Sequence, residues 1–195
     1  AASNAFSVVD AHVNLKNLSL EAPAYALATQ GTSAGFKADS CIIVSTGRPA
    51  SSLRGSSVTS PAVYTNCVWK SGGVNGQNII ISNLADASYV FRNCTTTGAA
   101  NTQFDMRANG FALNVEFTNT LCVSAGGSTQ FQNAGGGTIT LTGSDNVGGS
   151  NNAFPVALQA LSQTWTVSTN PADLSTGSLA IYDATTGALV RAAGN

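Results

Sequence analysis

The sequence predicts an all-β protein whose body is a short parallel β-helix with rungs of about 26 residues. Three observations lead to this prediction. Like residues recur along the chain at one common period, strand-like runs fall at fixed places within that period, and turn residues separate the runs. The central part of the chain has no window with helical periodicity.

The repeat shows first in the cysteines, whose successive spacings are 26, 27 and 28 residues: Cys41, Cys67, Cys94 and Cys122. Two more columns are spaced 27 and 26 residues, an aromatic one (Tyr64, Phe91, Phe117) and an asparagine one (Asn66, Asn93, Asn119). Other residues recur at 26 or 27, namely Gln77, Gln103 and Gln130, and Asn83 with Asn109. Several columns with one period indicate a true structural repeat.

Within each unit the sequence indicates strands and turns. Residues 115–119 and 138–142 alternate apolar with polar side chains, which is typical of a half-buried strand, and residues 78–82 form a β-branched run. Glycine-rich turns occur at 71–73, 125–127 and 135–137. The unit has too few leucines for a leucine-rich horseshoe and is too short for a propeller blade.

Stacked rungs place equivalent residues one strand spacing apart, about 4.8 Å. We therefore expect Tyr64, Phe91 and Phe117 to stack inside the helix. Asn66, Asn93 and Asn119 are expected to form an amide ladder at a bend, each side chain bonding its neighbour. The four cysteines are expected to be reduced, buried thiols that serve packing, although stacked neighbours are also close enough for a disulfide.

The flanks do not follow the period. We expect residues 34–150 to form the β-helix and residues 1–33 an N-terminal arm or cap. Residues 151–195 are expected to form a C-terminal β-hairpin cap or docking segment, because strand-like residues 177–182 and 188–191 flank a turn at 183–187. Covers of this kind protect the terminal rungs of a solenoid.

Charge and composition exclude several classes of function. Charged residues make up only 9% of the chain, and the net charge is −1. The eight basic residues are scattered, so no basic patch for nucleic acid is expected. No apolar run approaches the roughly 20 residues that a membrane-spanning helix requires.

These stacked columns make the chain resemble the right-handed parallel β-helix proteins, which include the pectate-lyase-like group and the spikes and fibres of bacteriophages. The resemblance covers roughly residues 34–150. It implies right-handed winding and, by analogy with phage β-helices, a homotrimer that contacts other virion proteins such as the major capsid protein.

Few residues are candidates for chemistry. Trp69 and Trp165 are candidates for stacking on a sugar ring or for anchoring an interface, and Trp69 is expected near a turn. Asp105 and Arg107 share one strand face and are the other ligand or interface candidates. Paired with Glu116, Asp105 is also the candidate for polysaccharide cleavage, which needs two carboxylates or a carboxylate beside a base. We expect no metal site, because each cysteine stands alone in its rung, and no cofactor.

The leading hypothesis is a non-enzymatic structural protein of a bacteriophage-like virion, a trimeric β-helix that decorates the capsid or forms a spike or fibre. A surface poor in charge and rich in Ser, Thr, Asn and Gly suits extended contacts with related chains. The alternatives are a carbohydrate-binding adhesin or tailspike module, which would be extracellular, and a polysaccharide-degrading enzyme.

Overall fold

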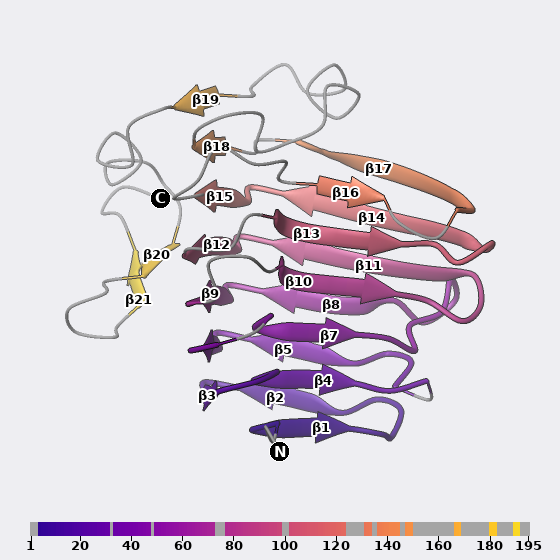
Figure 1. Cartoon of the computed structure of the whole chain (residues 1–195), viewed down its shortest axis with the longest axis horizontal. Coiled ribbons are helices and arrows are strands. Elements are labelled where there is room, and N and C mark those ends of the chain that lie inside the picture. Colours follow the sequence, from indigo (N-terminus) through magenta and orange to yellow (C-terminus); the bar gives the residue numbers. More distant parts are fainter. Residues whose placement is uncertain are drawn as a thin grey trace.

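The computed structural model describes residues 4–31, 33–47, 49–72, 77–98, 102–123, 131–133, 136–144, 147–149, 166–168, 180–182 and 189–191. Within these residues the chain is all-β, with no helix, and its strands wind into a parallel β-helix with rungs of roughly 26 residues (Figure 1). The predicted fold class is thereby confirmed. The described residues contain no helix long and apolar enough to span a membrane.

Each rung contributes one strand to each of three parallel sheets. Sheet A consists of β1 (Phe6–Val8), β4 (Leu27–Thr29), β7 (Ser51–Leu53), β10 (Gln77–Ser82), β13 (Thr102–Arg107) and β16 (Phe131–Asn133). Sheet B consists of β2 (Asn14–Lys16), β5 (Lys37–Asp39), β8 (Ala62–Thr65), β11 (Ala87–Arg92), β14 (Ala112–Thr118) and β17 (Thr138–Ser144). Sheet C consists of β3 (Ser19–Ala22), β6 (Ile42–Ser45), β9 (Val68–Ser71), β12 (Thr95–Gly98), β15 (Leu121–Val123), β18 (Val147–Gly149) and β19 (Thr166–Ser168).

The β-helix begins earlier than the sequence indicates. Residues 1–33 were expected to be an arm or cap outside the repeat, but β1, β2 and β3 pair in parallel with β4, β5 and β6 and form the first rung. The register explains the error, because Asn14 pairs with Lys37 only 23 positions later, whereas Lys37 pairs with Val63 26 positions later. The first rung is short and therefore falls outside the period.

The C-terminal hairpin is present, with β20 (Ala180–Tyr182) antiparallel to β21 (Leu189–Arg191), as residues 177–182 and 188–191 predict. Its predicted turn, 183–187, lies outside the described residues. Before it, β19 pairs in parallel with β18, so sheet C continues beyond residue 150.

A single bend connects sheet B to sheet C in every described rung. One residue at each bend adopts a left-handed conformation with φ between 49° and 56°: Asn17, Ser40, Asn66, Asn93 and Asn119. Asparagine tolerates this conformation better than most residues because its short polar side chain bonds locally. The backbone shape of the corner therefore accounts for the asparagine column.

The core is a stack of aromatic rings inside the β-helix. The ring of Phe91 stacks between those of Tyr64 and Phe117, with centroids 5.0 and 5.3 Å apart and interplanar angles of 11° and 16°. Phe104, from sheet A, packs edge-on against Phe91 and Phe117. All four rings are fully buried. Offset aromatic stacking adds to the apolar burial that stabilises the fold.

Sheet A follows a slightly different period. Gln77 pairs with Thr102, 25 positions later, so Gln77 and Gln103 do not share a column, in contrast to the expected spacing of 26. Gln103 lies beside Asn78 instead, and Asn78 Nδ2 donates to Gln103 Oε1 at 3.0 Å. Asn109 is likewise one position past the column of Asn83, and its Nδ2 donates to the Asn83 carbonyl at 2.9 Å. Gln130 lies outside the described residues.

Candidate functional site

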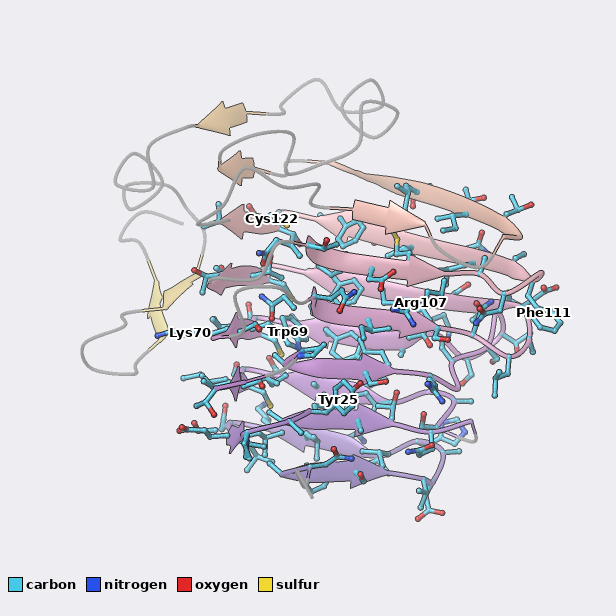
Figure 2. The ribbon with its side chains drawn as sticks, viewed as in Figure 1. Tyr25, Trp69, Lys70, Arg107, Phe111 and Cys122 are labelled. Carbon is cyan, nitrogen blue, oxygen red and sulfur yellow. The ribbon has the colours of Figure 1, made fainter. Side chains whose placement is uncertain are left out.

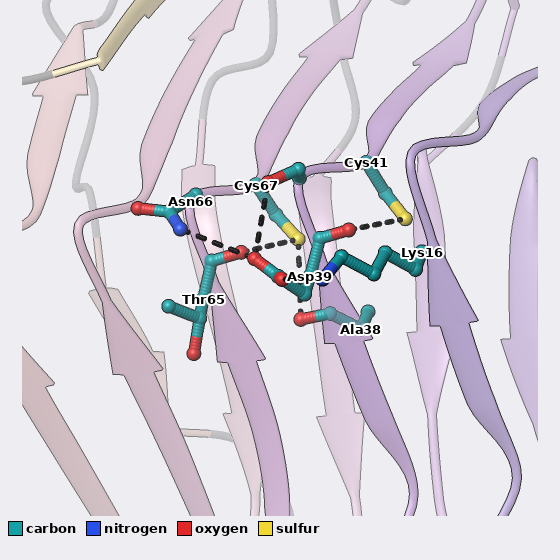
Figure 3. Close-up of polar contacts among 8 residues, drawn as sticks. Lys16, Ala38, Asp39, Cys41, Thr65, Asn66 and Cys67 are labelled. Carbon is teal, nitrogen blue, oxygen red and sulfur yellow. Dashed lines mark hydrogen bonds and ion pairs between the residues drawn. The ribbon is translucent and has the colours of Figure 1, made fainter.

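The bend between sheets B and C carries a continuous ladder of polar side chains. Asn119 Nδ2 donates to Asn93 Oδ1 at 2.8 Å, and Asn93 Nδ2 donates to Asn66 Oδ1 at 3.3 Å. Asn66 Nδ2 in turn donates to Asp39 Oδ1 at 3.1 Å, and Lys16 Nζ lies 3.6 Å from Asp39 Oδ2. The structure thus contains the expected amide ladder and ends it with an acid and a base (Figure 3).

Asp39 is the charged end of this ladder. The hydrogen bond from Asn66 is the main reason that the pKa of the Asp39 carboxyl lies below its usual value, with smaller contributions from the Ser40 hydroxyl and Lys16. Desolvation acts in the opposite direction. Because these donors favour the ionised form, Asp39 anchors the ladder as a carboxylate.

The cysteine column lies next to the ladder and has a repeated hydrogen-bond pattern. Cys67 Sγ donates to the Thr65 carbonyl at 3.2 Å and to the Ala38 carbonyl of the preceding rung at 3.6 Å. Cys94 Sγ repeats this with the carbonyls of Arg92 and Tyr64, at 3.3 and 3.4 Å.

The fourth member of this column is Thr120, not Cys122. Thr120 Oγ1 donates to the carbonyls of Thr118 and Phe91, at 3.2 and 3.4 Å, which continues the cysteine pattern. Cys122 lies two residues further on and pairs in register with Thr96. The spacing of 28 residues before Cys122 therefore reflects a change of column.

The four cysteines are free and fully buried. Burial raises the pKa of the Cys94 and Cys122 thiols to about 12, and the pKa of Cys67 is also raised, mainly by its hydrogen bond with Cys41. The same bond lowers the pKa of Cys41. Since the thiolate is the nucleophile, Cys94 and Cys122 act at neutral pH as weak hydrogen-bond donors and as packing.

Trp69 does not lie on the surface, which corrects its assignment to sugar stacking or to an interface. Its side chain is fully buried on β9, with the ring centroid 5.5 Å from that of Tyr64 and 5.8 Å from that of Phe91 (Figure 2). Trp69 Nε1 donates to Ser51 Oγ at 2.9 Å, so its polar atom is also satisfied. The reason is its register with Ile43 and Thr96, both fully buried residues of sheet C. Trp165 lies outside the described residues.

Asp105 and Arg107 pair with each other, as their shared strand face predicts. Arg107 Nε donates to Asp105 Oδ2 at 3.0 Å, and this bond raises the pKa of the guanidinium. Asp105 is fully buried, and its other oxygen, Oδ1, has no hydrogen-bond partner within the described structure.

Glu116 is not brought into a site with Asp105. It lies on β14 of sheet B, whereas Asp105 lies on β13 of sheet A. Glu116 Oε1 accepts from Arg92 Nη2 at 3.1 Å. Each of these two acids therefore forms an ion pair with its own arginine.

Two surface features have no counterpart in the sequence motifs. A groove of about 480 Å³ follows the first rungs of sheet C and is lined by hydroxyl, charged and apolar residues, among them Ser19, Glu21, Ile42, Val44 and Lys70. The other feature is a series of exposed apolar side chains in the turns between sheets A and B. Such turns were expected to be polar or glycine-rich, so apolar residues within them were the available signal.

The described residues include no group of three or more His, Cys, Asp or Glu that could hold a metal ion. Comparisons with protein-family models, curated proteins and solved structures gave no match to this chain. Function must therefore be argued from the β-helix and its surfaces.

Proposed function

We propose that this chain is a non-enzymatic structural protein, a β-helix that associates as a homotrimer and decorates a bacteriophage-like capsid or forms part of its spike or fibre. In this role its partners are copies of itself and other virion proteins, such as the major capsid protein, and its location is the virion.

The observation that supports this proposal is the continuous stacking of side chains through the rungs. Rings stack inside, while the ladder from Lys16 to Asn119 links the bends outside the core. Close-packed interiors deform little and transmit force. A rod of this kind suits a projecting structural element, and the charge content of 9% suits close contact between similar surfaces.

The test is the mass of the purified chain in solution, measured by sedimentation equilibrium over a range of concentrations. The proposal predicts a species near three times the chain mass of 19.7 kDa. It also predicts that an antibody against the chain detects it in virus-like particles purified by density gradient from the source culture. A monomer at every concentration, with no signal in the particles, would overturn the proposal.

The groove on sheet C favours a second candidate, a carbohydrate-binding module. It combines hydroxyls with one carboxylate, Glu21, and one ammonium group, Lys70, and such convergent polar groups orient small ligands. A glycan array tests this candidate. Glu21→Gln and Lys70→Ala should each abolish a binding signal that Lys37→Ala, a change on sheet B, leaves intact. A chain that binds no glycan removes the candidate.

A further inference from the structure

Four of the large apolar side chains that are exposed in the described structure lie along one edge of the β-helix. They are Val9, Val58, Leu84 and Phe111, with exposed fractions of 56, 48, 68 and 41%. Each lies in a turn that leads from a strand of sheet A to the following strand of sheet B. We call these four residues the apolar edge.

The edge is continuous over three successive rungs. Val58 lies between β7 and β8, Leu84 between β10 and β11, and Phe111 between β13 and β14. These turns lie on the right-hand side of the molecule, where Phe111 projects outward (Figures 1 and 2). Successive rungs rise by about 4.8 Å, so the three side chains are close enough to form one contact surface. Contiguous exposed apolar groups mark interaction sites more often than isolated ones do.

Opposite charges flank the edge. Arg54 is exposed directly after β7, on the sheet A side, and Asp86 is exposed directly before β11, on the sheet B side. Asp86 Oδ1 accepts a hydrogen bond from the Ala112 amide. Within the described part of the chain, neither Arg54 nor Asp86 forms an ion pair.

This arrangement of charges selects a mode of association. Rotation about an axis parallel to the β-helix brings the sheet A side of one copy against the sheet B side of its neighbour, so that positive meets negative. An antiparallel twofold pairing would place Arg54 against Arg54 and Asp86 against Asp86.

We propose that a second copy of this chain covers the apolar edge, with the two β-helices parallel and Arg54 of one copy facing Asp86 of the next. The inference rests on the self-association in the proposed function and identifies the surface that makes it. The apolar side chains supply the buried centre of the contact, and the charges set its orientation.

The experiment compares full-length variants by sedimentation velocity at several concentrations, with the thermal unfolding of each variant followed by circular dichroism. Leu84→Glu should raise the dissociation constant about tenfold or more, because it introduces a charge at the centre of the contact. Leu18→Glu is the matched control, since Leu18 is 39% exposed but lies at the corner between sheets B and C. It should leave the dissociation constant unchanged.

A charge exchange tests the orientation. Arg54→Asp and Asp86→Arg should each weaken association, and the double variant should restore it, as only parallel neighbours allow. If the wild-type chain is a monomer, this inference fails together with the homotrimer. If the wild-type chain is an oligomer that tolerates Leu84→Glu, or that Leu18→Glu disrupts equally, only the inference about the edge fails. Single charge variants without effect, or a double variant without rescue, overturn the parallel arrangement.

Discussion

The two corners on either side of sheet B differ in regularity. From sheet B to sheet C the chain always turns within two residues, at 17–18, 40–41, 66–67, 93–94 and 119–120. From sheet A to sheet B the connecting segments vary widely, at 9–13, 30–36, 54–61, 83–86 and 108–111. The constant corner keeps the rungs in register, whereas the variable corner changes the surface from rung to rung.

This difference separates stability from recognition. A constant turn places identical side chains above one another, so Asn66, Asn93 and Asn119 bond across rungs. A variable turn cannot form such a ladder, and there Leu84 and Phe111 face solvent. Substitutions at the constant corner and on the strand that leads to it should therefore affect folding, and those at the variable corner should affect association.

The largest contrast is expected between two phenylalanines. Phe91→Ala should lower the free energy of unfolding by about 3–5 kcal/mol, because Phe91 is fully buried between Tyr64 and Phe117 and the change leaves a cavity. Phe111→Ala, on the apolar edge, should change it by about 0.5 kcal/mol or less. Urea unfolding, monitored by circular dichroism at a concentration where both variants have the same oligomeric state, measures the two values. Similar losses in both variants would contradict the division between the two corners.

The next effect concerns the asparagine ladder. Asn93→Ala should cost about 2 kcal/mol, because it strains a residue with φ of 51° and leaves Asn66 Oδ1 and Asn119 Nδ2 without their partner. Asn93→Gly relieves the backbone strain but not the lost bonds, so it should recover part of the loss. Urea unfolding of the two variants separates the terms. Full recovery in Asn93→Gly would show that the ladder contributes nothing beyond the bend.

The sequence predicts the regular part of this structure well. The aromatic and asparagine columns follow one period because both lie beside the corner of constant length, where register and sequence spacing agree. Predictions fail where segment length varies. The short first rung hides β1 to β3, and the 25-residue offset in sheet A separates Gln103 from Gln77.

Side-chain direction is the second limit. Trp69 was expected near a turn, yet it is the inward residue of a strand, because Val68 and Trp69 are both buried and simple alternation gives no sign of which faces the core. The apolar edge was not predicted either. Its members occupy equivalent corners of the fold but have no common spacing in the sequence, since the turns that carry them differ in length.

A smaller effect is expected in the cysteine column, where Thr120 takes the place of a cysteine. Cys94→Thr should be nearly neutral, because the hydroxyl can donate to the Arg92 and Tyr64 carbonyls as Thr120 does to Thr118 and Phe91. Cys94→Val has almost the same shape but no donor, and should be less stable than Cys94→Thr by about 0.5–1.5 kcal/mol. Thermal unfolding of the pair measures the difference. Equal stability would mean that the column is maintained by packing alone.

The smallest effect concerns the charged end of the ladder. The folded-state pKa of Asp39 lies below its ordinary value of 3.8, chiefly because Asn66 donates to the carboxylate. Its contribution to stability is therefore complete above the unfolded-state pKa and is lost as the pH falls through the folded-state pKa. Asp39→Asn retains an amide acceptor for Asn66 but has no charge for Lys16, a pair that is largely exposed and therefore weak. Between pH 5 and the acid limit of folding, the unfolding midpoint in urea should fall less steeply for Asp39→Asn than for the wild type. Glu116→Gln, which removes the ion pair with Arg92 outside the ladder, is the control, and its acid dependence should remain closer to that of the wild type because no amide donates to that carboxylate among the described contacts. If Asp39→Asn and the wild type lose stability in parallel as the pH falls, the ladder does not depend on a carboxylate at its end, and the constant corner is stabilised by its amides and its bend alone.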